Sequence, residues 1–314
     1  MAENTVKKIA TRESYGNSLK ELAEEFPNLV VLDADLAAAT KTGIFRKAYP
    51  DRHIDCGIAE SNMMGVAAGL SLVGKIPFVS SFAMFAAGRA FEQVRNSIGY
   101  PHLNVKIGAT HAGITVGEDG ATPQCNEDIA LMRTIPGMVV MCPSDDVEAR
   151  AAVRAALEYE GPVYIRFGRA AVPVINDHPG YHFEIGKGTV VREGKDVTIV
   201  ATGICVDSAL GAAKMLEEEG ISAEVVNICT IKPLDEEIII NSAKKTGKVV
   251  TVEEHSVIGG LGSAVCDCLC ANHPVPVKKV GMQDVFGESG SAAALVEKYG
   301  LDAKGVYKSV KEFL

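Results

Sequence analysis

The sequence predicts an α/β protein made of two doubly wound domains. Its 314 residues exceed the length of one average domain. Short apolar runs alternate with stretches of helical spacing along the whole chain, a pattern typical of parallel sheets covered by helices. One stretch, AAVPVINDHPGYHFEIGKG, is rich in proline and glycine and indicates a linker. We therefore expect a first domain at 1–175, a linker at 176–188 and a second domain at 189–314.

The periodicity also predicts the individual elements. In the first domain we expect strands at 29–32, 53–55, 77–80, 105–109 and 163–167, and helices at 12–25, 61–72 and 145–160. The last helix has Ser144 as its candidate N-cap and ends at Gly161 and Pro162. In the second domain we expect strands at 197–202, 223–228 and 248–254, helices at 208–219 and 235–242, and a glycine-rich turn leading into a further helix.

Composition excludes several classes of protein. A net charge of -9 argues against a nucleic-acid partner, because phosphate binding needs clustered Lys and Arg. The chain shows neither a signal peptide nor an apolar run of membrane-spanning length, so we expect a cytoplasmic protein with no membrane partner. Cys266, Cys268 and Cys270 lack a zinc-site spacing and would not share a helix face, so we assign no metal ligands to this chain.

Polar residues gather where the expected strands of the first domain end, which is where open parallel sheets bind ligands. Taken singly, each has an ordinary interpretation. Glu60 could be a dipole partner in the first turn of a helix, and Asp35 a turn or cap residue. Phe82 and Phe85 would be core residues of an apolar run. The ordered set of motifs changes these interpretations.

In order, GIAE, SSFAMFAAGRA, THAGITVGEDG and RTIPGMVVMCPSD resemble the pyrimidine-binding domain of transketolases and of 1-deoxyxylulose-5-phosphate synthases. The second domain, with VEEHSVIGGLGSAV, resembles the C-terminal domain of the same family, so the resemblance covers nearly the whole chain. It implies thiamine diphosphate as cofactor and phosphosugars as substrates.

The resemblance also implies roles for single residues. Glu60 is the carboxyl group that bonds the aminopyrimidine and favours the tautomer able to activate the thiazolium. Phe82 stacks on the pyrimidine, Phe85 lines the same pocket, and Asp35 supports cofactor binding across a subunit interface. The remaining matches concern the sugar: the substrate-binding candidates are Arg12, His111, Asp119 and Arg169. The catalytic candidates are Glu60 and His111.

Two positions depart from the transketolase pattern. Pro123 stands where transketolases have a second histidine that contacts the reacting end of the donor sugar, and proline cannot donate a hydrogen bond. Ala39 replaces a serine of the phosphate site. Both changes leave the identity of the sugar open.

One part of a transketolase has no counterpart in the sequence, namely the GDG motif and the asparagine that bind the diphosphate and its metal. We therefore expect a second polypeptide, an N-terminal transketolase subunit, to hold the diphosphate with Mg²⁺ or Ca²⁺. The expected assembly is a heterotetramer with two copies of each chain, in which this chain also self-associates.

The expected activity is transfer of a two-carbon ketol unit from a ketose phosphate to an aldose phosphate, as in pentose phosphate metabolism. Within the same family, a deoxyxylulose-phosphate synthase or a transketolase for an unusual sugar stays open. The β subunit of 2-oxo acid dehydrogenases shares the two domains but lacks the phosphate-binding trio. A non-catalytic scaffold subunit is the alternative from another class, although it would have no need of a buried carboxylate at position 60.

Overall fold

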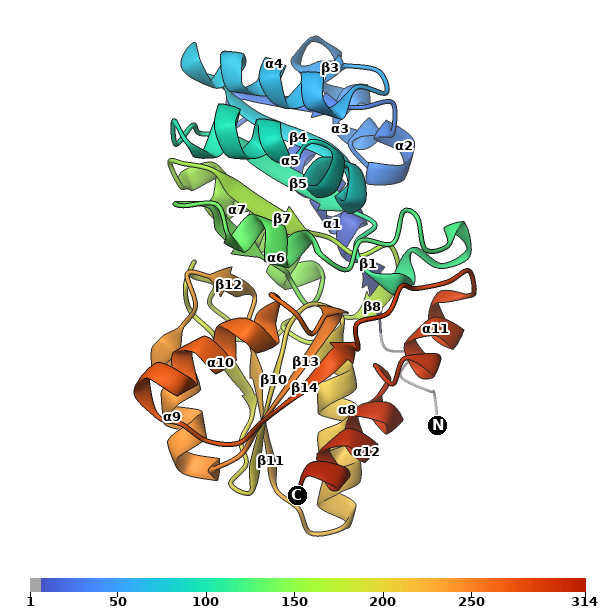
Figure 1. Cartoon of the computed structure of the whole chain (residues 1–314). Helices are drawn as coiled ribbons and strands as arrows, with labels where there is room; N and C mark the ends of the chain where they lie inside the picture. The colour runs from blue at the N-terminus through green and yellow to red at the C-terminus, as the bar shows by residue number, and fades with distance from the viewer. Residues whose placement is uncertain (1–6) are drawn as a thin grey trace.

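The computed structural model describes residues 7–314, and it has two α/β units stacked one above the other (Figure 1). Residues 1–6 of the predicted first domain lie outside the described residues. The segment 176–188, predicted to be the linker, contains no strand or helix. The predicted fold class is confirmed, because each unit is a mostly parallel sheet with helices on both faces.

The first unit is built on a seven-stranded sheet in the order β12-β6-β7-β5-β4-β2-β3. All neighbours are parallel except β12, which pairs antiparallel with β6. Its strands are β2 (Leu29–Asp33), β3 (His53–Asp55), β4 (Ile76–Phe82), β5 (Lys106–Thr110), β6 (Val139–Met141), β7 (Val163–Arg166) and β12 (Thr230–Lys232). The sequence did not predict β12, which comes from the second half of the chain and forms the edge strand of this sheet beside β6.

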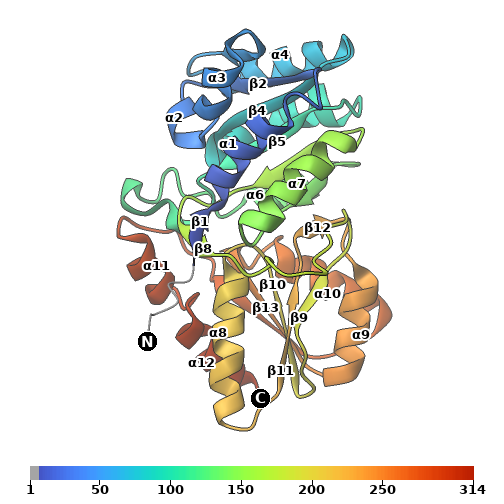
Figure 2. The same ribbon diagram turned by 180° about the vertical axis from the view of Figure 1, so that it is seen from behind.

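Helices cover both faces of this sheet because its strands are apolar on both sides. On one face α1 (Thr11–Leu22) packs beside α7 (Asp146–Glu158), and α4 (Glu60–Leu72) lies on the other (Figure 2). The shorter helical pieces are α2 (Ala37–Thr40), α3 (Gly43–Ala48), α5 (Phe91–Gln93), α6 (Asp128–Arg133), the π-helical turns η2 (Met84–Arg89) and η3 (Val94–Gly99), and the 3₁₀ turns η1 (Pro50–Arg52) and η4 (Ile114–Asp119).

The second unit has a five-stranded sheet in the order β14-β13-β10-β11-β9, with only β9 antiparallel. The strands are β9 (Thr189–Arg192), β10 (Val197–Ala201), β11 (Ala223–Asn227), β13 (Val249–Ser256) and β14 (Val277–Met282). The helices are α8 (Cys205–Glu218), α9 (Glu236–Thr246), α10 (Leu261–Asn272), α11 (Ala292–Lys298) and α12 (Ala303–Phe313). A small antiparallel pair of β1 (Lys8–Ala10) and β8 (Ala171–Pro173) lies between the two units.

Two details differ from the sequence predictions. The N-cap of α7 is Asp145 and not Ser144, because the Asp145 carboxylate accepts the Glu148 N–H while the Ser144 hydroxyl donates to the Glu148 side chain. The helix predicted at 12–25 ends at Leu22, before the turn that leads into β2. The other predicted strands and helices are present in the predicted order, but the sequence did not predict β1, β6, β8, β9, β14, α2, α3, α5, α6, α11 or α12.

The three clustered cysteines lie in different surroundings on α10: Cys268 is buried, Cys266 half-buried and Cys270 exposed. Within residues 7–314 no group of three His, Cys, Asp or Glu side chains could hold a metal ion. Among the same residues, no helix has the length and apolar character needed to cross a membrane.

Candidate functional site

The parallel strands place the predicted site residues along one edge of the first sheet. Phe82 ends β4, His111 follows β5 and Arg169 follows β7, and these three strands are neighbours in the sheet. Arg12 reaches the same edge from the first turn of α1. Its backbone N–H donates to the Gly168 carbonyl. Since the carboxyl ends of parallel strands meet at one edge, residues far apart in the sequence lie together here.

Glu60 is the first residue of α4 and is only 2% exposed. The Nη1 atom of Arg89 lies 3.2 Å from both carboxylate oxygens. Arg89 comes from the π-helical turn η2, and its guanidinium also lies 4.6 Å from the centre of the Phe85 ring. The planar Arg89 guanidinium is thus both bonded to Glu60 and stacked on Phe85.

The two predicted aromatic residues line one cavity. Their rings are 5.8 Å apart and nearly parallel, and the cavity has a volume of about 820 Å³. The remaining lining comes from η2 and from the loop after β5: Met84, Gly88, Arg89, Asp119, Thr122 and Pro123. The cavity is thus aromatic on one side and polar on the other. Phe78, by contrast, is fully buried and packs against Tyr15 in the core.

A cluster of cations lies beside this cavity. The Phe82 ring stacks on the His111 imidazole at 3.9 Å, and the Arg12 Nη1 atom lies 3.1 Å from His111 Nε2. Because arginine can only donate, Nε2 accepts, and Nδ1 carries the proton and donates to the Thr110 hydroxyl at 2.9 Å. His111 is therefore neutral in this arrangement. Its backbone has a φ of 56°.

The electrostatics of the cluster indicate an anion site. Burial and, to a smaller extent, the charges of Arg12, Arg169 and Lys41 together lower the pKa of His111 to about 3. Burial and Arg169 likewise lower the pKa of Arg12. The Arg12 Nε atom is buried and has no hydrogen-bond partner among the residues that the structure describes. A bound phosphate would supply both the missing acceptor and the missing negative charge.

Of the sequence departures, Pro123 lines the cavity and Ala39 belongs to the cation cluster. The Ala39 carbonyl accepts from Arg12 Nη1 at 2.9 Å, so the backbone of this position, rather than a serine hydroxyl, orients the guanidinium. Arg169 is oriented by the Val116 carbonyl and by Glu118.

Asp35 is a predicted cofactor-site residue that does not line the cavity. It is exposed, has a φ of 60°, and its backbone N–H donates to Asp55 Oδ1 at the ends of β2 and β3. The neighbouring Asp33 is buried and accepts from Leu36 N, Thr40 and Thr42, so Asp33 organises this turn while Asp35 faces outward. Within residues 7–314 the Asp35 carboxylate has no hydrogen-bond or ion-pair partner, and its predicted role stays a prediction.

Sequence reasoning missed Arg89 and Lys41. Arg89 follows Phe85 by four residues, a spacing that places both on one side of a helical turn and could have indicated the contact. Lys41 has a φ of 71° just after α2, and the sequence contains no signal for that conformation.

Comparison with known proteins agrees with this geometry. Residues 7–174 match the family described as "Transketolase, pyrimidine binding domain". Residues 186–306 match the family described as "Transketolase, C-terminal domain". The chain belongs to the transketolase family. This family depends on thiamine diphosphate, and the unit that carries Glu60 is its pyrimidine-binding domain.

Among transketolase relatives, a protein of Methanocaldococcus jannaschii described as a transketolase C-terminal section is 52% identical, over 96% of this chain and 95% of its own. A 6-deoxy-6-sulfo-D-fructose transketolase subunit of Clostridium sp. is 49% identical over 96% and 93%. Human transketolase is 36% identical over 97% of this chain but only 49% of its own length. A solved structure described as "Split gene transketolase, inactive beta4 tetramer" superimposes with a TM-score of 0.89 at 58% identity, covering 98% of both chains.

Proposed function

We propose that this chain is one subunit of a two-chain, thiamine diphosphate-dependent transketolase that moves a two-carbon ketol unit from a ketose phosphate to an aldose phosphate. The observation that carries the proposal is the buried Glu60 carboxylate bonded to Arg89, which lines an aromatic cavity next to the Arg12, His111 and Arg169 cluster. When bound, the cofactor supplies a thiazolium carbon that attacks the donor carbonyl and carries the transferred unit.

In this proposal each residue of the cavity and of the cation cluster has its own role. Glu60 accepts a hydrogen bond from the pyrimidine and favours its reactive tautomer, while Phe82 and Phe85 orient the ring and exclude water. Arg12, His111 and Arg169 bind the terminal phosphate of the sugar, and Asp119 faces the sugar chain from the cavity wall. Since His111 sits at the border of cavity and cluster, it can also contact the reacting sugar.

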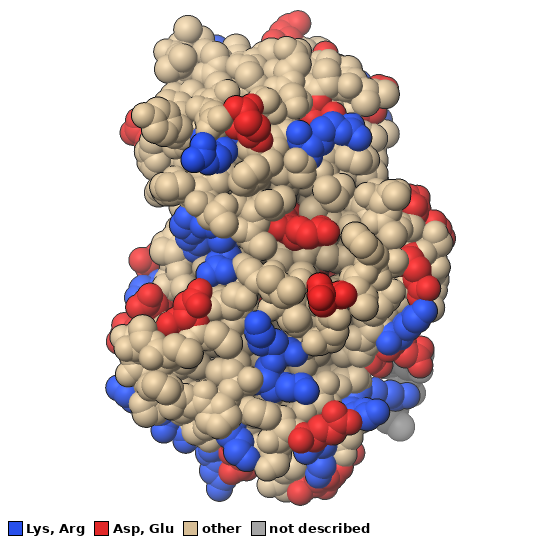
Figure 3. Space-filling view, viewed as in Figure 1, with Lys and Arg blue, Asp and Glu red and all other residues tan. Residues whose placement is uncertain are grey.

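The proposal includes a partner chain, because a relative matched over 98% of both chains is described as a split gene transketolase and another as a transketolase C-terminal section. The first unit offers a surface for one: Ile58, two residues before Glu60, is 76% exposed, and Leu72 and Val73 at the other end of α4 are each 73% exposed. Figure 3 shows few charged side chains on this part of the molecule, while the lower unit carries charges of both signs. The partner would hold the diphosphate and Mg²⁺ or Ca²⁺, in an assembly of two copies of each chain.

The test is reconstitution with the candidate partner chain. The pair should convert xylulose 5-phosphate and ribose 5-phosphate to sedoheptulose 7-phosphate, and each chain alone should be inactive. Glu60→Gln should lower kcat at least a hundredfold, the size expected for a lost proton-transfer group, without dissociating the complex. Glu92→Gln, at an exposed glutamate of the neighbouring α5, is the matched control and should keep full activity. An active Glu60→Gln complex would refute the proposal.

Pro123 favours a second candidate, in which the donor is an unusual sugar. A proline at the cavity wall offers no hydrogen bond to the sugar, and the cation cluster suits a sulfonate as well as a phosphate. The 6-deoxy-6-sulfo-D-fructose transketolase subunit is a relative with that donor in its name. Comparing kcat/KM for fructose 6-phosphate and 6-deoxy-6-sulfofructose decides between them. Turnover of pyruvate instead would point to the synthase or dehydrogenase alternatives.

A further inference from the structure

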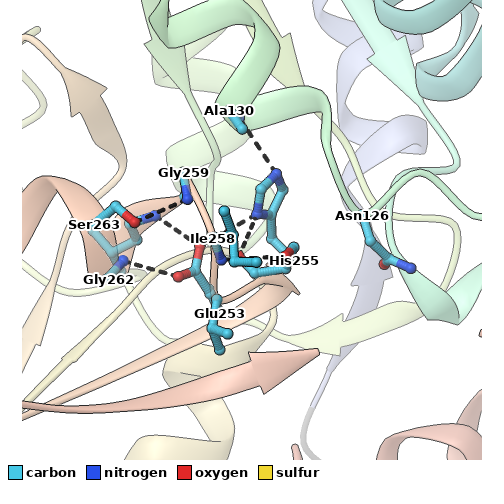
Figure 4. A network of polar contacts seen from close by, with 12 residues as sticks. Asn126, Ala130, Glu253, His255, Ile258, Gly259, Gly262 and Ser263 are labelled. Atoms are coloured by element: carbon cyan, nitrogen blue, oxygen red, sulfur yellow. Dashed lines mark hydrogen bonds and ion pairs between the residues drawn. The ribbon is translucent and has the colours of Figure 1, made fainter. Parts of the chain in front are cut away.

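Three successive buried side chains at the end of β13 each reach a different element: Glu253, Glu254 and His255. Glu253 accepts the N–H groups of Leu261 and Gly262 at the start of α10, within the second unit. His255 lies against the first unit, where Ala130 N donates to its Nε2 atom at 3.4 Å (Figure 4). Because side chains alternate along a strand, Glu254 points the opposite way from these two.

Glu254 contacts the loop that carries the sugar-site residues. We call residues 111–120, between His111 and Gly120, the substrate loop. The Glu254 Oε1 atom accepts the Thr115 N–H at 2.6 Å. The side chain lies so close to Gly113 that a Cβ there would come within 2.3 Å of Glu254 Cδ, and Gly113 has a φ of 75°. Only glycine therefore allows this carboxylate to approach the loop.

The other end of the contact is a buried ion network. Arg166 Nη2 donates to the Glu254 carbonyl at 2.7 Å, and its Nη1 lies 3.9 Å from the Glu254 carboxylate. Arg166 Nε is 2.9 Å from Asp128, which also accepts from the Tyr164 hydroxyl. Burial raises the pKa of Glu254, and the nearby Arg166 opposes that rise. Arg166 of β7, which Asp128 of α6 orients, thus bonds the Glu254 backbone and places a positive charge near its carboxylate.

The second unit also contacts the substrate loop through a hydrogen bond and through apolar packing. Gln124 Nε2 donates to the carbonyls of Ile114 and Glu288, so it joins the loop to the segment before α11. The Ile114 side chain is buried in the apolar core of the second unit. The loop therefore follows a strand of the first sheet, but its Ile114 side chain packs in the core of the second unit.

We propose that Glu254 is a positioning residue that fixes the substrate loop through the Thr115 N–H and so holds His111 and Asp119 in place for the phosphosugar. This inference rests on the proposed function and assigns the C-terminal unit a part in substrate binding. Glu254 itself touches neither cofactor nor sugar. Its effect on turnover passes through the backbone of the loop.

The first test measures the loop itself. In the isolated chain, Glu254→Ala should raise the amide hydrogen-exchange rate of a peptide covering 111–120 at least tenfold, the size of one charge-assisted hydrogen bond. Glu254→Gln keeps the volume and should show a smaller increase. Glu253→Gln is the matched control: it loosens the start of α10 and should leave the loop protected. An unchanged loop in Glu254→Ala would overturn the proposal whatever the activity.

The second test uses the reconstituted enzyme. Glu254→Ala should raise KM for the donor phosphosugar about tenfold while the affinity for thiamine diphosphate, measured by titration calorimetry, stays within about twofold. Glu253→Gln should leave KM unchanged. Equal losses of cofactor affinity and KM would show general misfolding and overturn the positioning role. If no variant turns over phosphosugars, the proposed function fails and the exchange experiment alone still decides the role of Glu254.

Discussion

At the residue scale, several charged groups of the site are only partly balanced by charges of opposite sign from the same chain. Glu60 is buried, yet its one ion-pair partner within residues 7–314, Arg89, has a side chain that is 54% exposed. Arg12 is half-buried beside the buried His111, and within residues 7–314 no carboxylate is bonded to either. Both arrangements have measurable consequences for stability, even without the cofactor.

Replacement of Arg89 by methionine removes the partner of Glu60 and leaves a buried carboxylate uncompensated. We expect Arg89→Met to lower the free energy of unfolding of the cofactor-free chain by about 1–2 kcal/mol, less than for a fully buried pair because solvent screens Arg89. Urea denaturation at pH 7 measures it. Arg95→Met is the control, since Arg95 is exposed and bonds only its neighbour Asn96. Equal effects of both variants would contradict a special role for the pair.

His111 should make the stability of the chain depend on pH. Its pKa is lowered from 6.5 to about 3 in the folded chain, so the unfolded chain binds a proton first as the pH falls. The contribution is fully present above pH 6.5 and decreases steadily below it, toward pH 3. We expect urea midpoints of the wild type to fall between pH 7.5 and 5.5, and those of His111→Asn to fall less.

Phosphate supplies an independent check on the same group. A bound anion favours the protonated imidazole, so phosphate should flatten the pH dependence of the wild type and leave that of His111→Asn unchanged. An identical slope in both proteins with and without phosphate would show that His111 does not meet the anion.

At the element scale, hydrogen bonds to single carboxylates fix how helices join the sheets. Asp145 is buried and accepts three backbone N–H groups, those of Glu148, Ile175 and Asn176. It therefore caps α7 and also fastens the chain as it leaves the first domain. The cap of α12 is simpler, because Asp302 accepts only the N–H of Gly305.

The two caps should differ in their contribution to stability. We expect Asp145→Ala to lower the free energy of unfolding by about 2–3 kcal/mol, because it leaves several buried N–H groups unpaired. Asp302→Ala should cost about 1 kcal/mol, as an ordinary cap does. Thermal and urea unfolding of both variants measure the difference. A similar loss in the two would mean that the contacts to 175 and 176 contribute nothing.

The sequence predicted those elements whose bounds depend on a local pattern of residues. Strand β3 was predicted to the residue, and the start of α4 at Glu60 to within one, because apolar periodicity and turn residues are local signals. The prediction of Ser144 as the cap was wrong, because the next residue, Asp145, is an equally good cap type and its carboxylate also accepts the N–H groups of 175 and 176, a contact distant in sequence. Lys41 and Glu254 depend on backbone geometry or on contacts across the whole chain, which no local pattern encodes.

At the scale of the whole molecule, the two units are joined by more than a linker. Strand β12 completes the first sheet, Lys232 Nζ donates to the carbonyls of Arg133 and Ile135, and the Arg166 network crosses from β7 to β13. Apolar residues of both units also form one continuous core cluster. The sequence predicted two domains correctly in architecture, but it could not show this sharing.

The shared core predicts cooperative unfolding. We expect the isolated chain to melt in a single calorimetric transition whose van 't Hoff and calorimetric enthalpies agree, despite its two sheets. Arg166→Met should lower the midpoint of that transition as a whole. Two resolved transitions, of which only one responds to Arg166→Met, would show that the units fold independently.

Strand β12 also sets a limit for protein engineering. Exchanging the C-terminal unit between relatives by recombination within 176–188 would give the first sheet a foreign edge strand, because Thr230–Lys232 travels with the second half of the gene. Chimeras of this kind should assemble only when the donor segment fits β6. Grafting residues 230–232 of the recipient into the donor would restore that fit, so the exchangeable module is a domain minus one strand.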